Sequence, residues 1–307
     1  MNRGFDYVEE LGRKADGSTL LDYLARRYPH SCRDEWAARI AAGRVLVDGA
    51  PASSSGTRLR SGQSLVWRRP PWREPQAPLC FAILHRDPHL LAVAKPRGLP
   101  TLPAGGHLEH TLLALVRRIV PEASPLHRLD RGVSGAVLFA RTELARRRLA
   151  AAWRRGKVAR TYVALAQGRP AWERRSIDLP IGPVPHPAGG TVHAASPLGR
   201  EARTEIRVLA PRAGGNTLLE VLLLTGRPHQ IRIHLAAAGH PLVGEPLYGP
   251  GGTPRAEARA RPGESGDPEF LLHAGRLELL HPATGQPLVI DCVPPPPLRI
   301  PAAAPTP

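Results

Sequence analysis

A proline-rich segment divides the chain into two parts. Residues 68–78 read RRPPWREPQAP and show neither helical nor strand periodicity. Because proline lacks an amide donor and stiffens the backbone, such a stretch is typical of a linker. We therefore expect a first domain at residues 16–69, a linker at 70–78 and a second domain at 79–294. Residues 295–307 are again proline-rich and are expected to form a disordered tail.

The net charge is strongly positive. The 307 residues include 42 Lys and Arg against 26 Asp and Glu, a formal charge of +16. Only Lys14, Lys95 and Lys157 are lysines, so the charge is carried by arginine, whose planar fork suits phosphates and base edges. This balance indicates a polyanion, a nucleic acid, as the partner.

The sequence also bears on compartment and assembly. Cys32, Cys80 and Cys292 are far apart and form neither a zinc pattern nor a disulfide framework. The first residues include acidic side chains without an apolar run, and no stretch approaches the ~20 apolar residues of a membrane span. We expect a cytoplasmic monomer that does not contact a membrane.

The first domain has the pattern of two helices and a small β ribbon. Thr19 or Ser18 is placed to cap a helix that begins at Leu20, and a second helix is expected from Asp34 to Ala42. Strands are expected at residues 44–47 and 64–67. This order, with GRVLVDG at the junction, resembles the S4 RNA-binding module. The resemblance implies phosphate contacts from five arginines: Arg26, Arg27, Arg33, Arg39 and Arg44.

The second domain mixes strands and helices without regular alternation. Apolar strand-like runs are expected at residues 81–84, 90–94, 136–140, 161–166, 205–209 and 218–224, and helices at 111–120 and 143–154. A doubly wound parallel sheet requires regular alternation, so the pattern favours an α+β fold with a mixed, largely antiparallel sheet flanked by helices.

The most informative segment is HRLDRGVSGAVLFART, residues 127–142. Asp130 lies in a glycine-containing basic loop that leads directly into an apolar strand. An aspartate held between Arg128 and Arg131 stays ionised, and such a carboxylate can act as a nucleophile. The string resembles the signature loop of the RluA-type pseudouridine synthases.

Four further segments resemble this family's motifs in the family's order. They are LLAVAKPRGLPTLP (90–103), RTYVALAQG (160–168), LLTGRPHQIRIHLAAAGHPLVGEPLYG (223–249) and LLHAGRLELLHP (271–282). The resemblance spans residues 79 to 293. It implies the pseudouridine synthase fold and an isomerase that converts uridine in RNA to pseudouridine without a cofactor.

The resemblance also implies roles for single residues. Asp130 matches the carboxylate that attacks the target uridine, so that the glycosidic bond breaks and the base is rejoined through C5. Tyr162 matches the tyrosine that packs on uracil and is expected to take the C5 proton. Arg232 matches the basic residue that pairs with the catalytic aspartate, and Arg128 is expected to fill the gap left by a flipped base. RNA or uracil contacts are further expected from His127, Leu271, Leu272, Lys95, Arg227 and Gln230.

Three positions depart from the family pattern. Val133 and Pro228 stand where threonine is usual, and Glu245 stands where aspartate is usual. None of these replaces Asp130, Tyr162 or Arg232. Two insertions are expected, at residues 183–199 and 250–268, and the second is expected to be a mobile loop. They are explained either by contact with RNA or by loop variation without a function.

Other readings are weaker. The histidine pairs at 107/110 and 229/234 lack the HExxH form and a cysteine partner, so no metal site is expected. A non-catalytic RNA-binding protein would share the charge but has no need of Asp130, Tyr162 and Arg232 together. The S4-like module favours 23S ribosomal RNA as substrate, with transfer RNA, or both RNAs, as alternatives.

Overall fold

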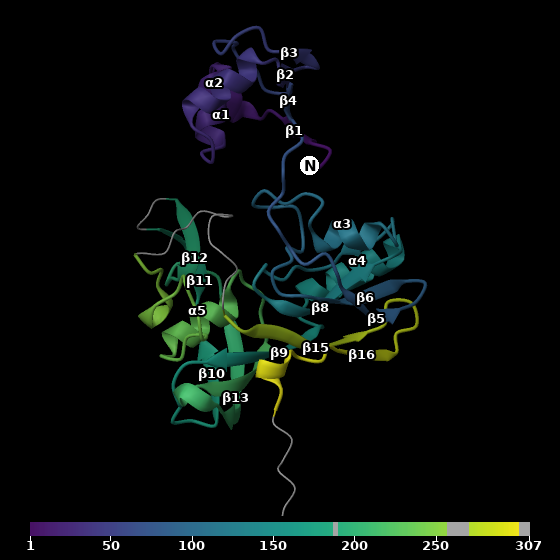
Figure 1. Cartoon of the computed structure of the whole chain (residues 1–307), viewed down its shortest axis with the longest axis vertical. Coiled ribbons are helices and arrows are strands. Elements are labelled where there is room, and N and C mark those ends of the chain that lie inside the picture. The colour runs from purple at the N-terminus through teal and green to yellow at the C-terminus, as the bar shows by residue number, and fades with distance from the viewer. Residues whose placement is uncertain (187–189, 257–269, 301–307) are drawn as a thin grey trace, which may run out of the picture. The chain divides into compact units, whose positions relative to one another are not determined.

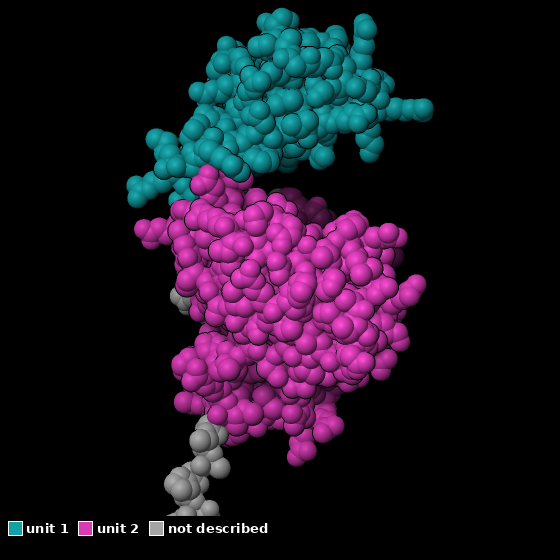
Figure 2. Space-filling view, turned by 90° about the vertical axis from the view of Figure 1, so that its right-hand side faces the viewer, with its two compact units in different colours: residues 1–74 teal, residues 75–307 magenta. Residues whose placement is uncertain are grey.

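The computed structural model describes residues 1–186, 190–256 and 270–300. The chain forms two compact units, Met1–Glu74 and Pro75–Pro307, which are coloured separately in Figure 2. Within the described residues, no helix has the length and apolar character needed to cross a lipid bilayer.

The first unit packs two helices on a four-stranded antiparallel sheet of order β1-β4-β2-β3. Thr19 accepts a hydrogen bond from the amide of Asp22 and so caps the first helix, as predicted. Leu20, Leu24, Trp36 and Ile40 from the two helices share a buried cluster with sheet residues. The elements are β1 (Phe5–Glu10), α1 (Leu20–Arg27), α2 (Arg33–Ala41), β2 (Val45–Val47), β3 (Ala50–Pro51) and β4 (Ser64–Arg69).

The predicted boundaries of this unit are wrong at both ends. β1 lies before residue 16 and pairs with β4 along its whole length, from Phe5 with Arg69 to Glu10 with Ser64. Part of the predicted linker also belongs to the unit, because the Asn2 side chain donates to Glu74 at 2.7 Å and accepts from the Trp72 amide at 3.0 Å. The start of the proline-rich segment is therefore anchored by Asn2, which precedes β1.

The second unit is built on a ten-stranded sheet (Figure 1). Its order is β10-β13-β14-β9-β15-β8-β6-β5, with β16 paired to β15 and β7 to β8. All pairs are antiparallel except β15 with β8, so the predicted mixed, largely antiparallel α+β sheet is confirmed. The strands are β5 (Ala82–Arg86), β6 (Leu90–Lys95), β7 (Ser124–Pro125), β8 (Ser134–Ala140), β9 (Ala159–Ala166), β10 (Arg174–Asp178), β13 (Arg203–Pro211), β14 (Thr217–Leu223), β15 (Leu272–Leu280) and β16 (Pro287–Asp291).

Both faces of the central strands are covered. Odd-numbered residues of β6 and β8, such as Leu91 and Phe139, pack with α3 (Leu112–Arg117) and α5 (Gln230–Ala237) in one cluster. Even-numbered residues, such as Leu90 and Leu138, pack with α4 (Glu143–Arg154) in another. Burial on both faces explains why these strands are continuous apolar runs in the sequence.

The parallel contact between β8 and β15 depends on a glycine. Gly135 has a φ of 122° and pairs with Ala274. A Cβ at this position would lie 2.3 Å from the Ala274 carbonyl oxygen, so no side chain fits there. The backbone of the segment that follows Asp130 is thereby fixed against the centre of the sheet.

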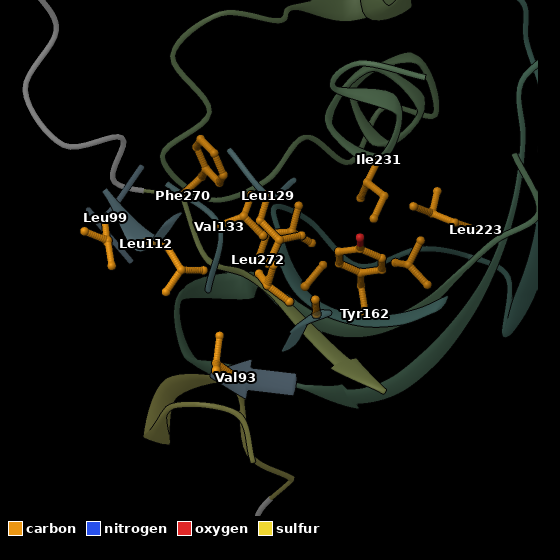
Figure 3. Close-up of a cluster of buried hydrophobic side chains, with 14 of the residues drawn as sticks. Val93, Leu99, Leu112, Leu129, Val133, Tyr162, Leu223, Ile231, Phe270 and Leu272 are labelled. Atoms are coloured by element: carbon orange, nitrogen blue, oxygen red, sulfur yellow. The ribbon is translucent and has the colours of Figure 1, made fainter. Parts of the chain in front are cut away.

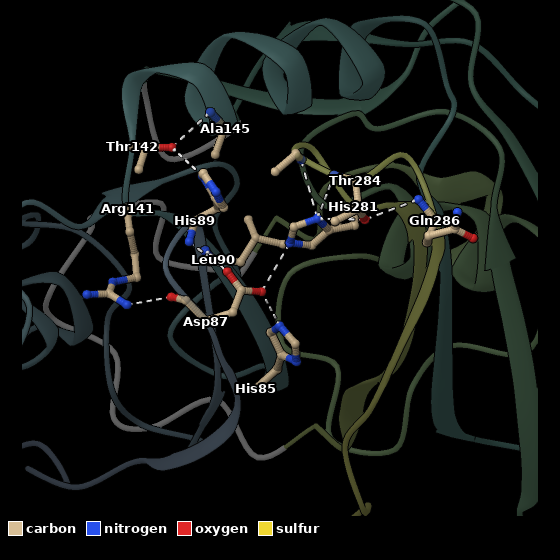
Figure 4. A network of polar contacts seen from close by, with 11 residues as sticks. His85, Asp87, His89, Leu90, Arg141, Thr142, Ala145, His281, Thr284 and Gln286 are labelled. Atoms are coloured by element: carbon tan, nitrogen blue, oxygen red, sulfur yellow. Dashed lines mark hydrogen bonds and ion pairs between the residues drawn. The ribbon is translucent and has the colours of Figure 1, made fainter.

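A polar network ties β5, β6 and the β15–β16 hairpin together (Figure 4). The Asp87 carboxylate accepts from His85 Nε2 at 2.5 Å and from His281 Nε2 at 3.2 Å. It also accepts from the backbone amides of His89 and Leu90. Burial opposes ionisation, but these hydrogen bonds outweigh it and lower the pKa of Asp87 to about 2.

The insertion predicted at residues 183–199 and the tail differ from expectation. Residues 183–199 include an antiparallel ribbon of β11 (Ile181–Pro185) and β12 (Thr191–Ala195). Of the loop predicted at 250–268, residues 257–268 lie outside the described residues. The tail is not disordered throughout: Pro296–Leu298 form a 3-10 turn that contacts β9, and Leu298 is buried. Prolines lose little conformational entropy on ordering, so one buried leucine anchors this segment. Residues 301–307 lie outside the described part.

Candidate active site

A pocket of about 520 Å³ gathers residues from six segments of the second unit. Five of these segments are the loop before β8, the end of α4, β9, the stretch from β14 into α5, and β15, and a sixth is β12, which contributes His193. The pocket contains Asp130, Tyr162 and Arg232, which lie 102 residues apart at most in sequence (232 − 130). The sequence predicted these three as one site, and the fold brings them together.

Two basic side chains lie close to the carboxylate of Asp130. Its carboxylate lies 3.8 Å from Arg128 Nη2 and 3.4 Å from His229 Nε2. The Arg128 side chain is two-thirds exposed, so this arginine is accessible from solvent as well as near Asp130. The loop itself is fixed from behind, because Thr101 Oγ1 both donates to and accepts from the backbone of Leu129.

Lys95 supports the Asp130 loop from inside the protein. Its side chain is 1% exposed, and Nζ donates to the carbonyls of Pro96, Leu99 and Arg131. Burial lowers its pKa to about 7, while the charge of Asp130 opposes the shift. The donors of Lys95 face backbone carbonyls, so this side chain holds the loop, and its RNA contact stays a prediction.

Tyr162 projects from β9 into an apolar part of the pocket. Figure 3 shows its ring among the side chains of Leu223, Ile231 and Leu272. Burial raises its pKa to about 12, although the charge of Arg160 opposes this rise. Of the two leucines predicted as an apolar floor, Leu272 lines the pocket. Leu271 is not among the lining residues, and its carbonyl accepts from the Leu165 amide.

Arg232 has a different partner from the one predicted. Its guanidinium makes a two-fold contact with Glu245, from Nε at 2.8 Å and from Nη2 at 2.7 Å. Both side chains are buried, and the arginine also lies over the Phe270 ring at 4.5 Å. Asp130 is near enough to raise the pKa of Arg232, yet the direct ion pair is with Glu245. The glutamate at position 245 thus keeps a carboxylate where aspartate is usual, and this carboxylate fixes Arg232.

His229 and Tyr248 are site residues to which the sequence analysis gave no role. The Tyr248 hydroxyl donates to the His193 carbonyl at 2.7 Å, so in its 2.6 Å contact with His229 the ring Nδ1 is the donor. Nε2 of the same ring faces Asp130. Burial lowers the pKa of His229, and Asp130 opposes that shift. The signal was present in the GRPHQIR string, where His229 was weighed only as a metal ligand.

Gln230 and Arg227 shape the turn that leads into α5. The Gln230 amide accepts from the Arg227 amide and from Thr225, and it donates to Arg203 and Thr204. Gln230 lines the pocket, but both its oxygen and its nitrogen are hydrogen-bonded within the protein, so it shapes the turn, and its RNA contact stays a prediction. Arg227 lines the pocket, and its Nε donates to the Glu201 carbonyl.

His127 closes the pocket near the end of α4. Its ring stacks on Trp153 with centroids 4.5 Å apart, and its Nε2 accepts from the Leu138 amide at 3.0 Å. Burial and the charge of Arg160 lower the pKa of His127 to about 3. The ring is therefore neutral at physiological pH, with its proton on Nδ1.

No set of three or more His, Cys, Asp or Glu side chains among the described residues is arranged to hold a metal ion. His234, from one of the two histidine pairs, instead donates from Nε2 to the Leu179 carbonyl, and its Nδ1 shares a hydrogen bond with the Thr204 hydroxyl. The pocket therefore presents a carboxylate beside a buried aromatic ring, surrounded by arginines, which suits nucleophilic chemistry on a flat base attached to an anionic backbone.

Comparison with known proteins agrees with this chemistry. Residues 89–237 match the family model described as RNA pseudouridylate synthase. The chain is 41% identical to an uncharacterized RNA pseudouridine synthase of Synechocystis sp., over 92% of this chain and 96% of that protein. It is 36% identical to the ribosomal large subunit pseudouridine synthase D of Pseudomonas aeruginosa, over 93% of this chain and 90% of that one.

A solved structure shows the same fold. Human RNA Pseudouridylate Synthase Domain Containing 1 superimposes with a TM-score of 0.57 at 25% identity, covering 74% of this chain and 89% of that one. The predicted reaction and fold are thus confirmed. Asp130, Tyr162 and Arg232 lie within the segment that matches the family model, and the chain belongs to the RluA family of RNA pseudouridine synthases.

Proposed function

We propose that this enzyme isomerises one or more uridines of 23S ribosomal RNA, with Asp130 as the nucleophile. The observation that carries the proposal is the position of Asp130 in a pocket that joins it to a buried aromatic ring and several arginines. A flipped uracil needs a flat apolar surface, and its backbone needs cationic neighbours. The relative named as a large-subunit synthase supports the choice of ribosomal RNA.

The chemistry follows from the side chains of the pocket. The Asp130 carboxylate bonds to C1′ of the target nucleotide as the C1′–N1 bond breaks, and the base turns while still bound. C5 then bonds to C1′ and displaces the carboxylate, which regenerates Asp130, while C5 loses a proton and N1 gains one. Tyr162, with Leu272 beside it, packs against the base during this turn. Arg232 acts as a positioning residue: its pairing with Glu245 gives it one orientation near Asp130.

The base role of Tyr162 can be separated from its packing role. Taking the C5 proton requires the phenolate, which burial disfavours and the charge of Arg160 favours. Tyr162→Phe keeps the ring and removes the hydroxyl. We expect this variant to bind RNA like the wild type and to convert it about 100-fold more slowly, the range of general base catalysis. Unchanged conversion would leave packing as the only role.

The first unit is proposed to bind structured RNA in the manner of an S4 module. Three of its five predicted arginines are engaged within the protein: Arg27 pairs with Glu9, Arg33 with Asp22, and Arg39 lies between the rings of Trp36 and Trp67. Arg44 and Arg26 are exposed and are the proposed phosphate contacts, although Arg26 also makes two long hydrogen bonds, to the Lys14 carbonyl at 3.4 Å and to Ser18 at 3.5 Å. Double substitution of these two by glutamine is expected to weaken RNA binding without changing the pocket.

Pseudouridine mapping tests the substrate. Total RNA from a deletion strain, complemented with wild type or with Asp130→Asn, is compared site by site. The proposal expects a 23S site that disappears on deletion and returns only with the wild type. A site in transfer RNA instead would move the assignment to that RNA. We place the enzyme in the cytoplasm as a monomer, which size measurement of the purified protein checks.

A further inference from the structure

Arg160 is a buried cation of the pocket that has no role in the reaction described above apart from its effect on the pKa of Tyr162. It projects from β9 two residues before Tyr162, so both side chains point to the same face of the strand. It is 9% exposed and lines the pocket together with Asp130 and Tyr162. Its position therefore gives it access to whatever occupies the pocket.

The hydrogen bonds of Arg160 leave its charge uncompensated. Nη2 donates to the carbonyls of Thr225 at 2.9 Å and Leu223 at 3.4 Å. Nε is buried without a hydrogen-bond partner, and within the described part of the chain no carboxylate forms an ion pair with this arginine. Neutral carbonyls offset only part of a buried charge, and burial lowers the pKa of the guanidinium. A cation in this state gains free energy from an anion supplied by a ligand.

The surroundings of Arg160 fit an anion and not a base. The guanidinium lies 5.6 Å from the centre of the Trp153 ring, which itself stacks on His127. His127 is neutral with a proton on Nδ1, and this nitrogen has no partner among the described residues, so it is a second donor lining the same pocket. No carboxylate is part of this group, which we call the Arg160 subsite: His127, Trp153 and Arg160.

The loop that contains Thr225 and Gly226 leaves room for the guanidinium of Arg160. Gly226 follows the Thr225 carbonyl that accepts from Nη2. A Cβ at residue 226 would lie 2.7 Å from Nη1, so any larger residue displaces the guanidinium. The pocket therefore positions this arginine by both its hydrogen bonds and the space that a glycine leaves.

We propose that the Arg160 subsite binds a backbone phosphate next to the target uridine. The substrate of this family is RNA, whose only anionic groups are phosphates. A nucleotide that is flipped into the pocket brings its own phosphates to the pocket wall. The subsite thereby stabilises the flipped state of the target nucleotide relative to the stacked state, because only the flipped nucleotide places a phosphate beside the buried guanidinium. This inference rests on the proposed function, because the RNA used to test it is the substrate proposed above.

The main test removes the charge from each side in turn. An RNA stem–loop that the wild type converts is made with one neutral methylphosphonate linkage, either 5′ or 3′ of the target uridine. The adjoining sugar carries a 2′-O-methyl group for stability, and the same sugar with an ordinary phosphate is the control. Single-turnover rates and KM are measured for wild type, Arg160→Gln and Arg160→Lys.

One of the two neutral linkages is expected to raise the wild-type KM by about tenfold or more, the size of a charge-assisted hydrogen bond. Arg160→Gln should raise KM by a similar factor on ordinary RNA and respond no further to that linkage. Arg160→Lys should recover part of the loss. The inference is overturned if neither linkage affects the wild type, or if the effects of linkage and variant multiply independently.

Two further variants separate this role from general charge and from an effect on Tyr162. Gly226→Ala keeps the net charge and displaces the guanidinium, so it should reproduce the KM effect of Arg160→Gln. Arg154→Gln removes an exposed arginine near the subsite and should leave the response to the neutral linkage intact. If Arg160→Gln instead leaves KM unchanged and shifts the pH profile of the rate, Arg160 acts through Tyr162 and the phosphate role is refuted.

A probe that needs no RNA sequence keeps the inference separate from the substrate assignment. Uridine 3′,5′-bisphosphate and uridine are titrated into the full-length wild type and Arg160→Gln. The bisphosphate should bind the wild type about tenfold more tightly than uridine, and the variant should lose this difference. Equal binding of both compounds by the wild type overturns the subsite. Failure of 23S RNA to react would refute the ribosomal assignment alone.

Discussion

Arg232 and Arg160 line one pocket and are buried to nearly the same degree, 7% and 9% exposed, yet their charges are treated in opposite ways. Arg232 shares two hydrogen bonds with a fully buried carboxylate, Glu245. Arg160 donates to backbone carbonyls only. A paired charge has one geometry and no need of a ligand, whereas an unpaired one gains from binding. The bonding partner of a buried arginine, and not its depth, indicates its role.

The largest effect is expected from Asp130→Asn. Replacing the nucleophile removes the covalent step, so conversion should fall by more than about 1000-fold, the scale of losing an essential nucleophile. Both arginines stay in place, so RNA binding should change by less than about threefold. Single-turnover assays and filter binding measure the two quantities. Loss of RNA binding together with activity would mean that Arg160 and Arg232 do not bind RNA independently of Asp130.

Glu245→Ala tests the buried ion pair between Arg232 and Glu245. This change leaves the Arg232 cation buried without a partner and is expected to lower the free energy of unfolding by about 3–5 kcal/mol. Urea denaturation measures it. The double variant Arg232→Met with Glu245→Leu is the control, because it removes both charges and should recover much of the stability without recovering activity. A single variant as stable as the wild type would show that Arg232 does not need its pair.

The Asp87 network offers a second paired charge, outside the pocket. Its pKa of about 2 lies below the ordinary value of 3.8, so the unfolded chain binds the proton more readily than the folded one. The resulting stability is present above pH 4 and is lost as the pH falls toward 2. Allowing for solvent screening, Asp87→Asn should cost about 1 kcal/mol at pH 6.

Denaturation at a series of pH values checks the network prediction. The difference between wild type and Asp87→Asn should shrink as the pH falls from 4 to 2, because both chains then lack the charge. A difference that is constant across this range would show that the contacts of Asp87, and not its ionisation, stabilise the network.

The smallest effect on stability is expected from replacing Arg160, which has no carboxylate partner among the described residues. Arg160→Gln removes a buried cation that has no counter-charge, so the free energy of unfolding should change by less than about 1 kcal/mol, and a rise is allowed. This is the counterpart of Glu245→Ala, measured by the same urea denaturation. A loss of more than about 2 kcal/mol would show that the two carbonyl acceptors already satisfy Arg160.

The sequence predicted the strands that the fold buries on both faces. Residues 90–94 and 136–140 are continuous apolar runs, and they form β6 and β8 in the middle of the sheet. β1 was missed because its residues, FDYVEE, are mostly exposed and three of them are acidic. An edge strand of this kind is specified by its pairing with β4, which lies some 60 residues away, and local sequence does not encode that pairing.

The site was predictable where motifs bring residues together and not where burial decides their role. Asp130, Tyr162 and Leu272 share one pocket, as the order of motifs indicated. Lys95 and Gln230 look like ligand-binding residues in sequence because they are polar, but both are buried and bonded to the backbone or to neighbouring side chains. Which carboxylate would meet Arg232 depended on the turn that carries Glu245 back to α5.

The central place of β15 has a consequence for how the enzyme is made. β15 lies between β9 and β8 in the sheet, although it comes more than 100 residues after either of them in the chain. During synthesis, Asp130, Tyr162 and Arg232 all leave the ribosome before Leu272, which completes the pocket. A nascent chain therefore carries its catalytic residues without a closed sheet to hold them. Activity begins only when translation is nearly finished, so a chain cut short before β15 cannot modify RNA.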